Sequence, residues 1–180
     1  IMKTDNNIRS YIKENEARFL DELFSLIRIP SISAEPAHKA DMLQCAERWR
    51  ELLIAAGVDH AEVMPSAGNP LVFAEKHVDD DAPTVLVYGH YDVMPVDPLE
   101  LWLSVPFEPE VRDESIFARG ADDDKGQSFI QLKAFEYLVR TRQLNHNVKF
   151  IFEGEEEIGS PSLNGFLQQH HDLLKCDIIL

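Results

Sequence analysis

Residues 84–92 read TVLVYGHYD, an apolar run that ends in glycine, histidine, tyrosine and aspartate. The apolar residues of Thr84–Tyr88 barely alternate with polar ones, which is typical of a central strand buried on both faces. In open α/β sheets, functional side chains gather at the carboxyl ends of such strands. The segment therefore predicts a buried strand that carries His90 and Asp92 to a functional site.

A second segment of the same design lies at residues 148–157, which read VKFIFEGEEE. Val148–Phe152 predicts another strand, and Glu153–Glu157 follows it directly. Between the two strands, Lys125–Arg140 has apolar residues at helical spacing. This order of strand, helix and strand predicts a parallel pair with the helix packed on the sheet. The residues expected to face inward are Phe129, Leu132, Phe135 and Leu138.

The chain before the first strand predicts two helices, over about residues 6–27 and 37–56, and a short strand at Leu71–Phe73. Gly57 is expected to end the second helix, whose inner stripe includes Trp49.

The other segments extend the same alternation. Residues 107–118 predict a β-ribbon that turns at Asp113–Glu114, after a proline-rich loop of residues 93–106. Ser160–Pro161 predicts the start of a last helix, with serine as the N-cap and proline in the first turn. Asp177–Leu180 predicts the beginning of a further strand. The expected fold class is therefore α/β, a mostly parallel sheet with helices on both faces.

Composition narrows the classes of partner. The chain has 180 residues, 44% apolar residues and a formal net charge of −15. It has no basic stripe for phosphate, so we expect no nucleic-acid partner. No apolar run reaches membrane-spanning length, and Ile1–Tyr11 lacks the apolar core of a signal peptide. Cys45 and Cys176 have no metal-ligand spacing and form no disulfide framework, so a cytoplasmic enzyme without a membrane partner fits best.

Three polar segments carry residue types that bind metals. On an extended chain His90 and Asp92 share a face, so Asp92 can accept the second ring N–H of a metal-bound His90. The glutamates at 153 and 155–157 can divide roles between metal binding and proton transfer. In ARGADDDKG, residues 118–126, a carboxylate beside flexible glycines can bridge two cations. Taken singly, the His90 segment is more often a polar turn and the glutamate run a solvated acidic loop. A calcium loop is the rival interpretation of the aspartate segment, although its spacing is not that of an EF-hand.

The three segments in this order resemble the co-catalytic zinc peptidases. That family includes carnosinase-type dipeptidases, aminoacylase, acetylornithine deacetylase and glutamate carboxypeptidases. The resemblance covers roughly residues 8–180 and is closest to the dipeptidase branch. The motifs that carry it are Tyr88–Val93, Pro98–Trp102, Pro106–Phe107, Ala118–Gly126 and Glu153–Ser160.

The resemblance implies a role for each candidate residue. His90 resembles a ligand of one zinc ion, and Asp92 the residue that orients its ring. Asp123 resembles the carboxylate that bridges two zinc ions, followed by a cis peptide bond to Asp124. Glu157 resembles a ligand of the other zinc ion, and Glu156 the general base.

The resemblance also implies how the chain is organised. Residues 1–180 are expected to be the N-terminal part of the catalytic domain, with two zinc ions, or manganese or cobalt, in a site that is incomplete within this chain. A further carboxylate ligand, a histidine ligand and the inserted dimerisation domain are expected beyond Leu180. The full-length protein is expected to be a homodimer that cleaves dipeptides or short peptides.

Other functions stay open at this point. An N-acyl amino-acid deacylase or desuccinylase would use the same residues, and a non-catalytic metal-binding protein could share the scaffold. A calcium-stabilised domain with acidic loops is a third alternative. Arg119 is expected to support the Asp122–Asp124 loop. The remaining histidines are expected to be surface or structural residues: His38, His60, His77, His146, His170 and His171.

Overall fold

A five-stranded sheet forms the centre of the protein in the computed structural model, which describes residues 2–180, with side chains from residue 6 onward. The strand order is β1-β2-β6-β3-β7. β6 pairs in parallel with β3, and β3 in parallel with β7, whereas β2 is antiparallel to both β1 and β6. All strands except β2 therefore run in one direction, which confirms the expected α/β class. The strands are β1 (His60–Met64), β2 (Leu71–Lys76), β3 (Thr84–His90), β6 (Asn147–Glu153) and β7 (Ile178–Ile179).

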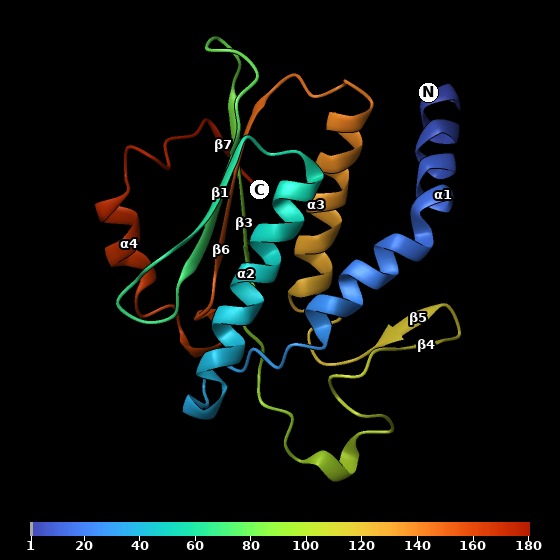
Figure 1. The fold of residues 1–180 in the computed structure, drawn as a ribbon, viewed down its shortest axis with the longest axis vertical. Coiled ribbons are helices and arrows are strands. Elements are labelled where there is room, and N and C mark those ends of the chain that lie inside the picture. Colours follow the sequence, from blue (N-terminus) through green and yellow to red (C-terminus); the bar gives the residue numbers. More distant parts are fainter. Residues whose placement is uncertain (1) are drawn as a thin grey trace.

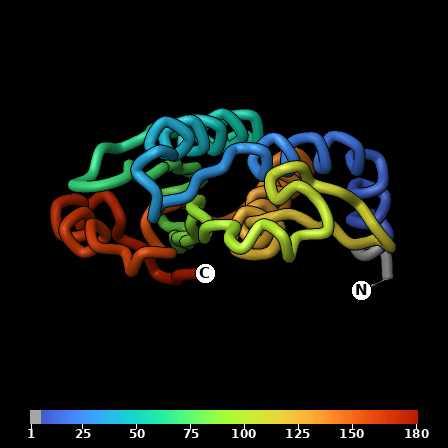
Figure 2. The backbone as a smooth tube through the Cα atoms, turned by 90° about the horizontal axis from the view of Figure 1, so that it is seen from below, coloured from blue at the N-terminus to red at the C-terminus, as the bar shows by residue number. Residues whose placement is uncertain are grey.

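Helices cover both faces of the sheet (Figure 1), as expected. α1 (Met2–Ile27), α2 (Lys39–Ala56) and α3 (Lys125–Arg140) pack on one face, and the short α4 (Leu163–Gln169) lies on the other. Figure 2 shows α1 and α2 on one side of the strands and the α4 segment on the opposite side. The central strands β3 and β6 are covered on both faces, which explains why their sequences are almost continuously apolar.

Side chains of β6 show this two-sided burial directly. Phe150 and Phe152 belong to the core under α2 and α3, together with Trp49 of α2. Ile151, which points to the other face, packs in the smaller core with Phe166 of α4. Successive residues of a strand point to opposite faces, so apolar side chains are needed in both alternating sets, Phe150 and Phe152 on one face and Ile151 on the other.

The boundaries of several elements agree with the sequence expectations. α3 spans Lys125–Arg140, and α2 ends at Gly57, which adopts a φ of 107° that glycine tolerates without strain. β4 (Glu110–Arg112) and β5 (Ser115–Phe117) form the expected ribbon, turning at Asp113 and Glu114 with φ angles of 49° and 62°. This ribbon and the preceding loop extend past the carboxyl edge of the sheet (Figure 1).

The expected start of the last helix at Ser160–Pro161 is wrong. α4 begins at Leu163, with Ser162 as its N-cap residue. Ser160 has a φ of 51° and its hydroxyl donates to Glu153 Oε1 at 2.9 Å instead of capping a helix. Ser160 and Gly159, with a φ of 85°, together end the 3₁₀ turn Glu156–Ile158, so the helix starts only after Pro161.

A buried charge cluster joins α1 to α3. The side chain of Glu136 is 1% exposed, and its carboxylate accepts hydrogen bonds from Lys133 at 2.7 Å and from Arg140 at 2.8 Å. Arg18 of α1 donates to the same carboxylate at 2.5 Å. Burial acts to raise the pKa of Glu136, but the hydrogen bonds from Arg18 and Lys133 outweigh it and lower the pKa to about 2.

We expect the protein to lose stability in acid through Glu136. The folded-state pKa lies below the ordinary value of 4.5, so the ionised group stabilises the fold above that pH. The stabilisation, at most about 3 kcal/mol, is lost as the pH falls from about 4.5 towards about 2. Urea unfolding of the wild type and of Glu136→Gln at pH 7, 4 and 3 measures this. The difference in unfolding free energy should shrink on acidification, and a difference independent of pH would contradict the assignment.

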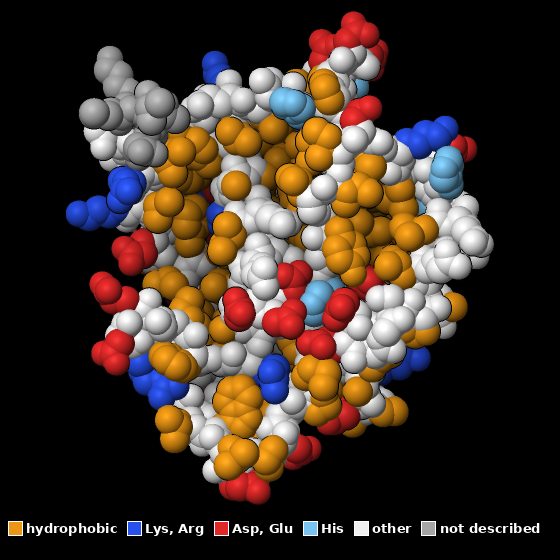
Figure 3. Space-filling model, turned by 180° about the vertical axis from the view of Figure 1, so that it is seen from behind, with side chains coloured by type: hydrophobic (Ala, Val, Ile, Leu, Met, Phe, Trp, Pro, Cys, Tyr) orange, Lys and Arg blue, Asp and Glu red, His pale blue; other side chains and the backbone are white. Residues whose placement is uncertain are grey.

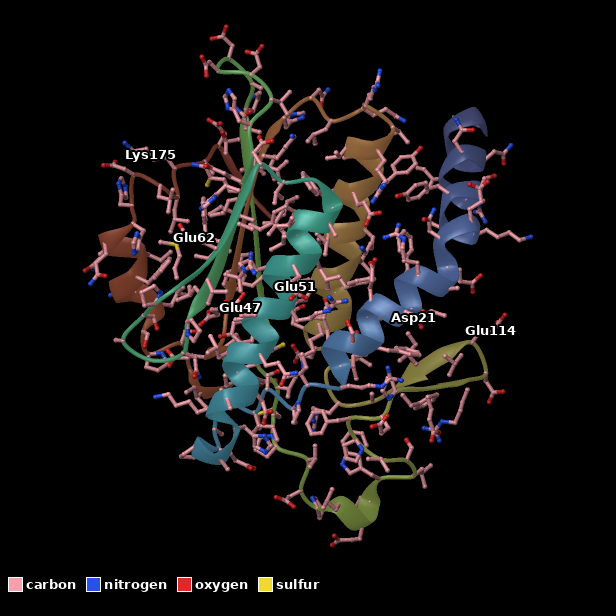
Figure 4. All side chains as sticks on the ribbon, in the orientation of Figure 1. Asp21, Glu47, Glu51, Glu62, Glu114 and Lys175 are labelled. Atoms are coloured by element: carbon pink, nitrogen blue, oxygen red, sulfur yellow. The ribbon has the colours of Figure 1, made fainter. Side chains whose placement is uncertain are left out.

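Two groups of acidic side chains lie on opposite sides of the molecule (Figures 3 and 4). Glu47 and Glu51 lie on the face of α2 turned away from the sheet (Figure 4), where they pair with Arg50 and Arg48. On the opposite side of the molecule, Asp and Glu side chains gather around a histidine (Figure 3).

Within residues 2–180, no helix combines the length and the apolar character needed to cross a membrane.

Candidate active site

His90 is the last residue of β3 and lies in register with Glu153, the last residue of β6. The two parallel strands therefore end at the same edge of the sheet, as the sequence predicts. The ring is almost fully buried between carboxylates. Nδ1 lies 3.1 Å from the carbonyl oxygen of Asp92 and 3.3 Å from Asp92 Oδ1. Nε2 lies 3.0 Å from Asp123 Oδ1 and 3.9 Å from Glu156 Oε2.

This arrangement favours a cation at His90 Nε2. A carbonyl oxygen only accepts hydrogen bonds, so Nδ1 carries the proton donated to Asp92. The lone pair of a neutral ring then points from Nε2 towards the carboxylates of Asp123 and Glu156, which repel it. Burial acts against a charged ring, but Asp92, Asp124 and Asp123 raise the pKa of His90 to about 9. A proton or a metal ion at Nε2 relieves this conflict.

Asp92 is fully buried directly behind the ring of His90. Its Oδ1 accepts a hydrogen bond from the backbone N–H of Glu156 at 3.2 Å, and its Oδ2 accepts one from the N–H of Glu157 at 3.0 Å. The hydroxyl of Ser33 donates to Oδ2 at 2.6 Å. One carboxylate therefore positions both the histidine and the acidic loop after β6.

The aspartates before α3 point in different directions. Asp124 turns inward, where its Oδ2 accepts the backbone N–H of His90 at 3.0 Å and the hydroxyl of Ser128 at 2.6 Å. Asp123 presents a largely exposed carboxylate to His90 Nε2. The peptide bond between them is cis, which confirms the expectation drawn from the family resemblance.

The acidic loop contributes Glu156 and Glu157 from a single 3₁₀ turn, Glu156–Ile158. Burial, and after it the negative charge of Asp123, raises the pKa of Glu157. Over the described part of the chain, no three His, Cys, Asp or Glu side chains are arranged as a complete metal-binding group. The structure thus brings His90, Asp92, Asp123 and Glu156 together, while the joint placement of His90, Asp123 and Glu157 as three ligands stays a prediction.

The structure also shows supporting residues that the sequence did not reveal. Lys125 is fully buried, and its Nζ donates to the carbonyl oxygens of Leu26 at 3.0 Å and Ile29 at 2.7 Å. This contact holds the end of α1 against the start of α3, beside the Asp123–Asp124 peptide. Burial lowers the pKa of Lys125.

Glu155 forms a similar link on the other side of the acidic loop. Its Oε1 accepts the N–H of Asn69 at 3.0 Å and its Oε2 accepts the N–H of Ser162 at 3.1 Å. The buried carboxylate therefore links the acidic loop both to the β1–β2 connection and to the segment before α4.

The expectation for Arg119 is corrected. Its Nη2 donates to the carbonyl oxygen of Pro95 at 3.0 Å, and its guanidinium lies 5.3 Å from the ring centroid of Trp102. Arg119 therefore supports the proline-rich loop of residues 93–106, which supplies both of these side-chain contacts.

The other histidines contact residues close to them in sequence. His38 Nδ1 lies 2.6 Å from Asp41, and the ring of His170 packs on Phe166. Similar short-range contacts are His60 to Glu62, His77 to Asp80, His146 to Asn145 and His171 to Asp172.

Comparison with known proteins places this geometry in context. The sequence pattern of Peptidase family M20/M25/M40 matches residues 86–179, just over half of the chain. The human Beta-Ala-His dipeptidase is 36% identical over 179 residues, which cover 90% of this chain and 34% of that protein. A succinyl-diaminopimelate desuccinylase of Paraburkholderia xenovorans is 30% identical over 145 residues, 79% of this chain and 36% of that protein.

Comparison with solved structures points to the same family. An M20 family metallo-carboxypeptidase of Sulfolobus solfataricus superimposes with a TM-score of 0.82 at 37% identity, covering 90% of this chain and 36% of that one. The chain spans between 20% and 36% of the length of the first curated relatives it matches. The resemblance inferred from the motifs is thereby confirmed, and the chain belongs to Peptidase family M20/M25/M40.

Proposed function

We propose that this chain supplies the water-activating part of a metal-dependent hydrolase that cleaves the amide bond of dipeptides or short peptides. The observation that carries the proposal is the convergence of Asp123 and Glu156 on His90 Nε2, with Asp92 behind the ring. Family membership and the dipeptidase relative support the same reaction.

The residues present fit a metal ion at this position. Imidazole nitrogen and carboxylate oxygen are ligands of zinc, and the unshared electron pair of His90 Nε2 faces two carboxylates that a divalent cation would join. We assign His90, Asp123 and Glu157 as ligands of two zinc ions, with manganese or cobalt as alternatives. When bound, such ions make water more acidic and polarise the carbonyl group of the substrate.

Glu156 is then the general base. Its carboxylate is half-exposed and lies beside His90 Nε2, so it can receive a proton from the attacking water and return it to the leaving amine. Asp92 contributes through its neighbours, because it holds the N–H groups of Glu156 and Glu157 and keeps the proton of His90 on Nδ1.

The wider organisation is part of the proposal. This chain spans 36% of one relative and 34% of another, and we propose that residues 1–180 are the N-terminal part of a larger catalytic domain. We propose that the full-length protein is a cytoplasmic homodimer.

The second candidate function is deacylation of N-acyl amino acids. It is favoured by the desuccinylase relative, which matches 79% of the chain. Both reactions cleave an amide bond with the same metal ligands and base, so substrate recognition outside these residues decides between them.

A substrate panel tests the proposal. We expect the protein at its natural length to hydrolyse members of a dipeptide panel, to lose turnover on chelation, and to regain it with zinc, manganese or cobalt but not calcium. Turnover confined to N-acyl amino acids would establish the deacylase. Metal binding without turnover on either panel would establish a non-catalytic protein, and restoration by calcium alone would contradict the assigned ligands.

A further inference from the structure

The segment after α1 runs beside the strand end that carries His90 and Asp92. The N–H of Val93 donates to the carbonyl oxygen of Ser31 at 2.9 Å, and Ile32 forms a parallel bridge with Val93. The hydroxyl of Ser31 donates to the carbonyl oxygen of Tyr91 at 2.6 Å. These bonds place Ser33 next to the buried carboxylate of Asp92.

Ser33 donates the shortest hydrogen bond that Asp92 accepts. Its hydroxyl lies 2.6 Å from Asp92 Oδ2, against 3.0 Å and 3.2 Å for the N–H groups of Glu157 and Glu156. O–H···O hydrogen bonds are ordinarily shorter than N–H···O bonds, and 2.6 Å lies in the range of a hydroxyl bonded to a carboxylate, a strong class of hydrogen bond. The carboxylate thus joins three segments distant in sequence: the loop after α1, the end of β3 and the acidic loop after β6.

The division of donors between the two oxygens defines the orientation of the carboxylate. Oδ2 accepts from Ser33 and Glu157, which leaves Oδ1 for Glu156 and for the ring of His90, 3.3 Å away. Without the Ser33 hydroxyl, Oδ2 would keep only the N–H of Glu157. The carboxylate could then rotate. The ring of His90 and the 3₁₀ turn of Glu156 and Glu157 would then be held less firmly, because both bond to Asp92.

We propose that Ser33 is a positioning residue for the hydrolytic site, acting through Asp92 on the metal-binding geometry of His90 and on the placement of Glu156. The inference rests on the proposed function for the roles of His90 and Glu156. Ser33 touches neither the metal ions nor the substrate in this scheme, and its effect is on how well the ligands are held.

Ser31 is the matched control. It lies two residues away in the same loop and donates a hydrogen bond of the same length, 2.6 Å, to the same strand end. Its acceptor is a backbone carbonyl oxygen instead of the Asp92 carboxylate. Loss of Ser31 should therefore reproduce the effect of loosening the loop without releasing Asp92.

The experiment compares Ser33→Ala, Ser33→Thr and Ser31→Ala in the protein at its natural length. Zinc affinity is measured by competition with a chelating dye, the ligand field by the visible spectrum of the cobalt form, and kcat and KM on a hydrolysed dipeptide. We expect Ser33→Ala to weaken zinc binding or lower kcat by roughly tenfold or more and to alter the cobalt spectrum, with KM within about twofold. Ser33→Thr, which keeps the hydroxyl, should restore both, and Ser31→Ala should lower only the melting temperature.

The inference is overturned if Ser33→Ala keeps wild-type zinc affinity, cobalt spectrum and kcat, or if Ser31→Ala changes them equally. Should Ser33→Ala fail to fold, Ser33→Cys, a weaker donor of similar size, must show the same selective loss. A wild type that binds zinc without turnover would reject the proposed function, and the zinc-affinity comparison would still decide the role of Ser33. A wild type that neither binds zinc nor turns over would overturn both.

Discussion

Replacing Glu156 by glutamine should lower turnover by ~10²–10⁴-fold while metal binding persists, because an amide cannot accept the proton of the attacking water. The substitution keeps the size and shape of the side chain. It also leaves the backbone N–H of Glu156 free to donate to Asp92, so the acidic turn should keep its position.

Glu157→Gln is the matched comparison, since the two residues are adjacent in the same 3₁₀ turn and only one is assigned as a ligand. Steady-state kinetics and metal content by atomic absorption should separate them. Glu156→Gln should retain metal and lose kcat, whereas Glu157→Gln should lose metal affinity. Near-normal turnover of Glu156→Gln would remove it from the role of general base.

Gly126→Ala should disrupt both the fold and the site. A Cβ added at Gly126 would lie 1.9 Å from the carbonyl oxygen of Ala121 and 3.0 Å from its carbonyl carbon. Both atoms belong to the backbone, so no side-chain rotation can relieve the clash. The loop from Ala121 to Lys125, which contains Asp123, would have to move. We expect a loss of unfolding free energy of about 2 kcal/mol or more, together with a large loss of turnover.

Gly165→Ala in α4 provides the control, because its added Cβ would meet nothing within 4 Å apart from its chain neighbours and the backbone of its own helix. This substitution within a helix should stabilise the protein by up to about 1 kcal/mol and leave kcat unchanged. Urea unfolding and kinetics of both variants measure the contrast. Wild-type stability and turnover in Gly126→Ala would show that the loop tolerates the displacement and that the fold and the site do not depend on its position.

The fold was predictable where one residue pattern dominated. β3 and β6 could be recognised from short, almost continuous apolar runs, and α3 from apolar residues at helical spacing; both patterns match the burial of these elements. β1 was missed because HAEVM is a mixed, largely half-exposed sequence at the edge of the sheet. Its strand conformation comes from pairing with β2, a tertiary contact that periodicity does not report.

The error at Ser160–Pro161 has a related cause. Serine followed by proline is a strong local signal for the start of a helix. Here the hydroxyl of Ser160 bonds instead to Glu153, seven residues earlier, and the left-handed backbone at Gly159 and Ser160 closes the preceding turn. The tertiary partner outweighs the local preference.

In the candidate site, too, residues within local motifs were predictable from the sequence and contacts between remote residues were not. His90, Asp92 and Asp123 could be singled out because each follows a strand or precedes a helix within a recognisable motif. The supporting contacts could not, because their partners are remote: Ser33 is 59 residues from Asp92, and Lys125 is 99 and 96 residues from the carbonyl groups it binds. Only the folded arrangement, with α1 against α3 and the loop after α1 beside Val93, brings these residues together.

Anomalous diffraction at the zinc edge, from crystals of the metal-loaded protein at its natural length, can locate the metal ions directly. We expect a zinc ion at bonding distance, about 2.0–2.2 Å, from His90 Nε2 and from a carboxylate oxygen of Asp123. We also expect a second ion that shares Asp123 and is held by Glu157. Zinc bound elsewhere, with His90 Nε2 free of metal, would contradict the proposed metal site.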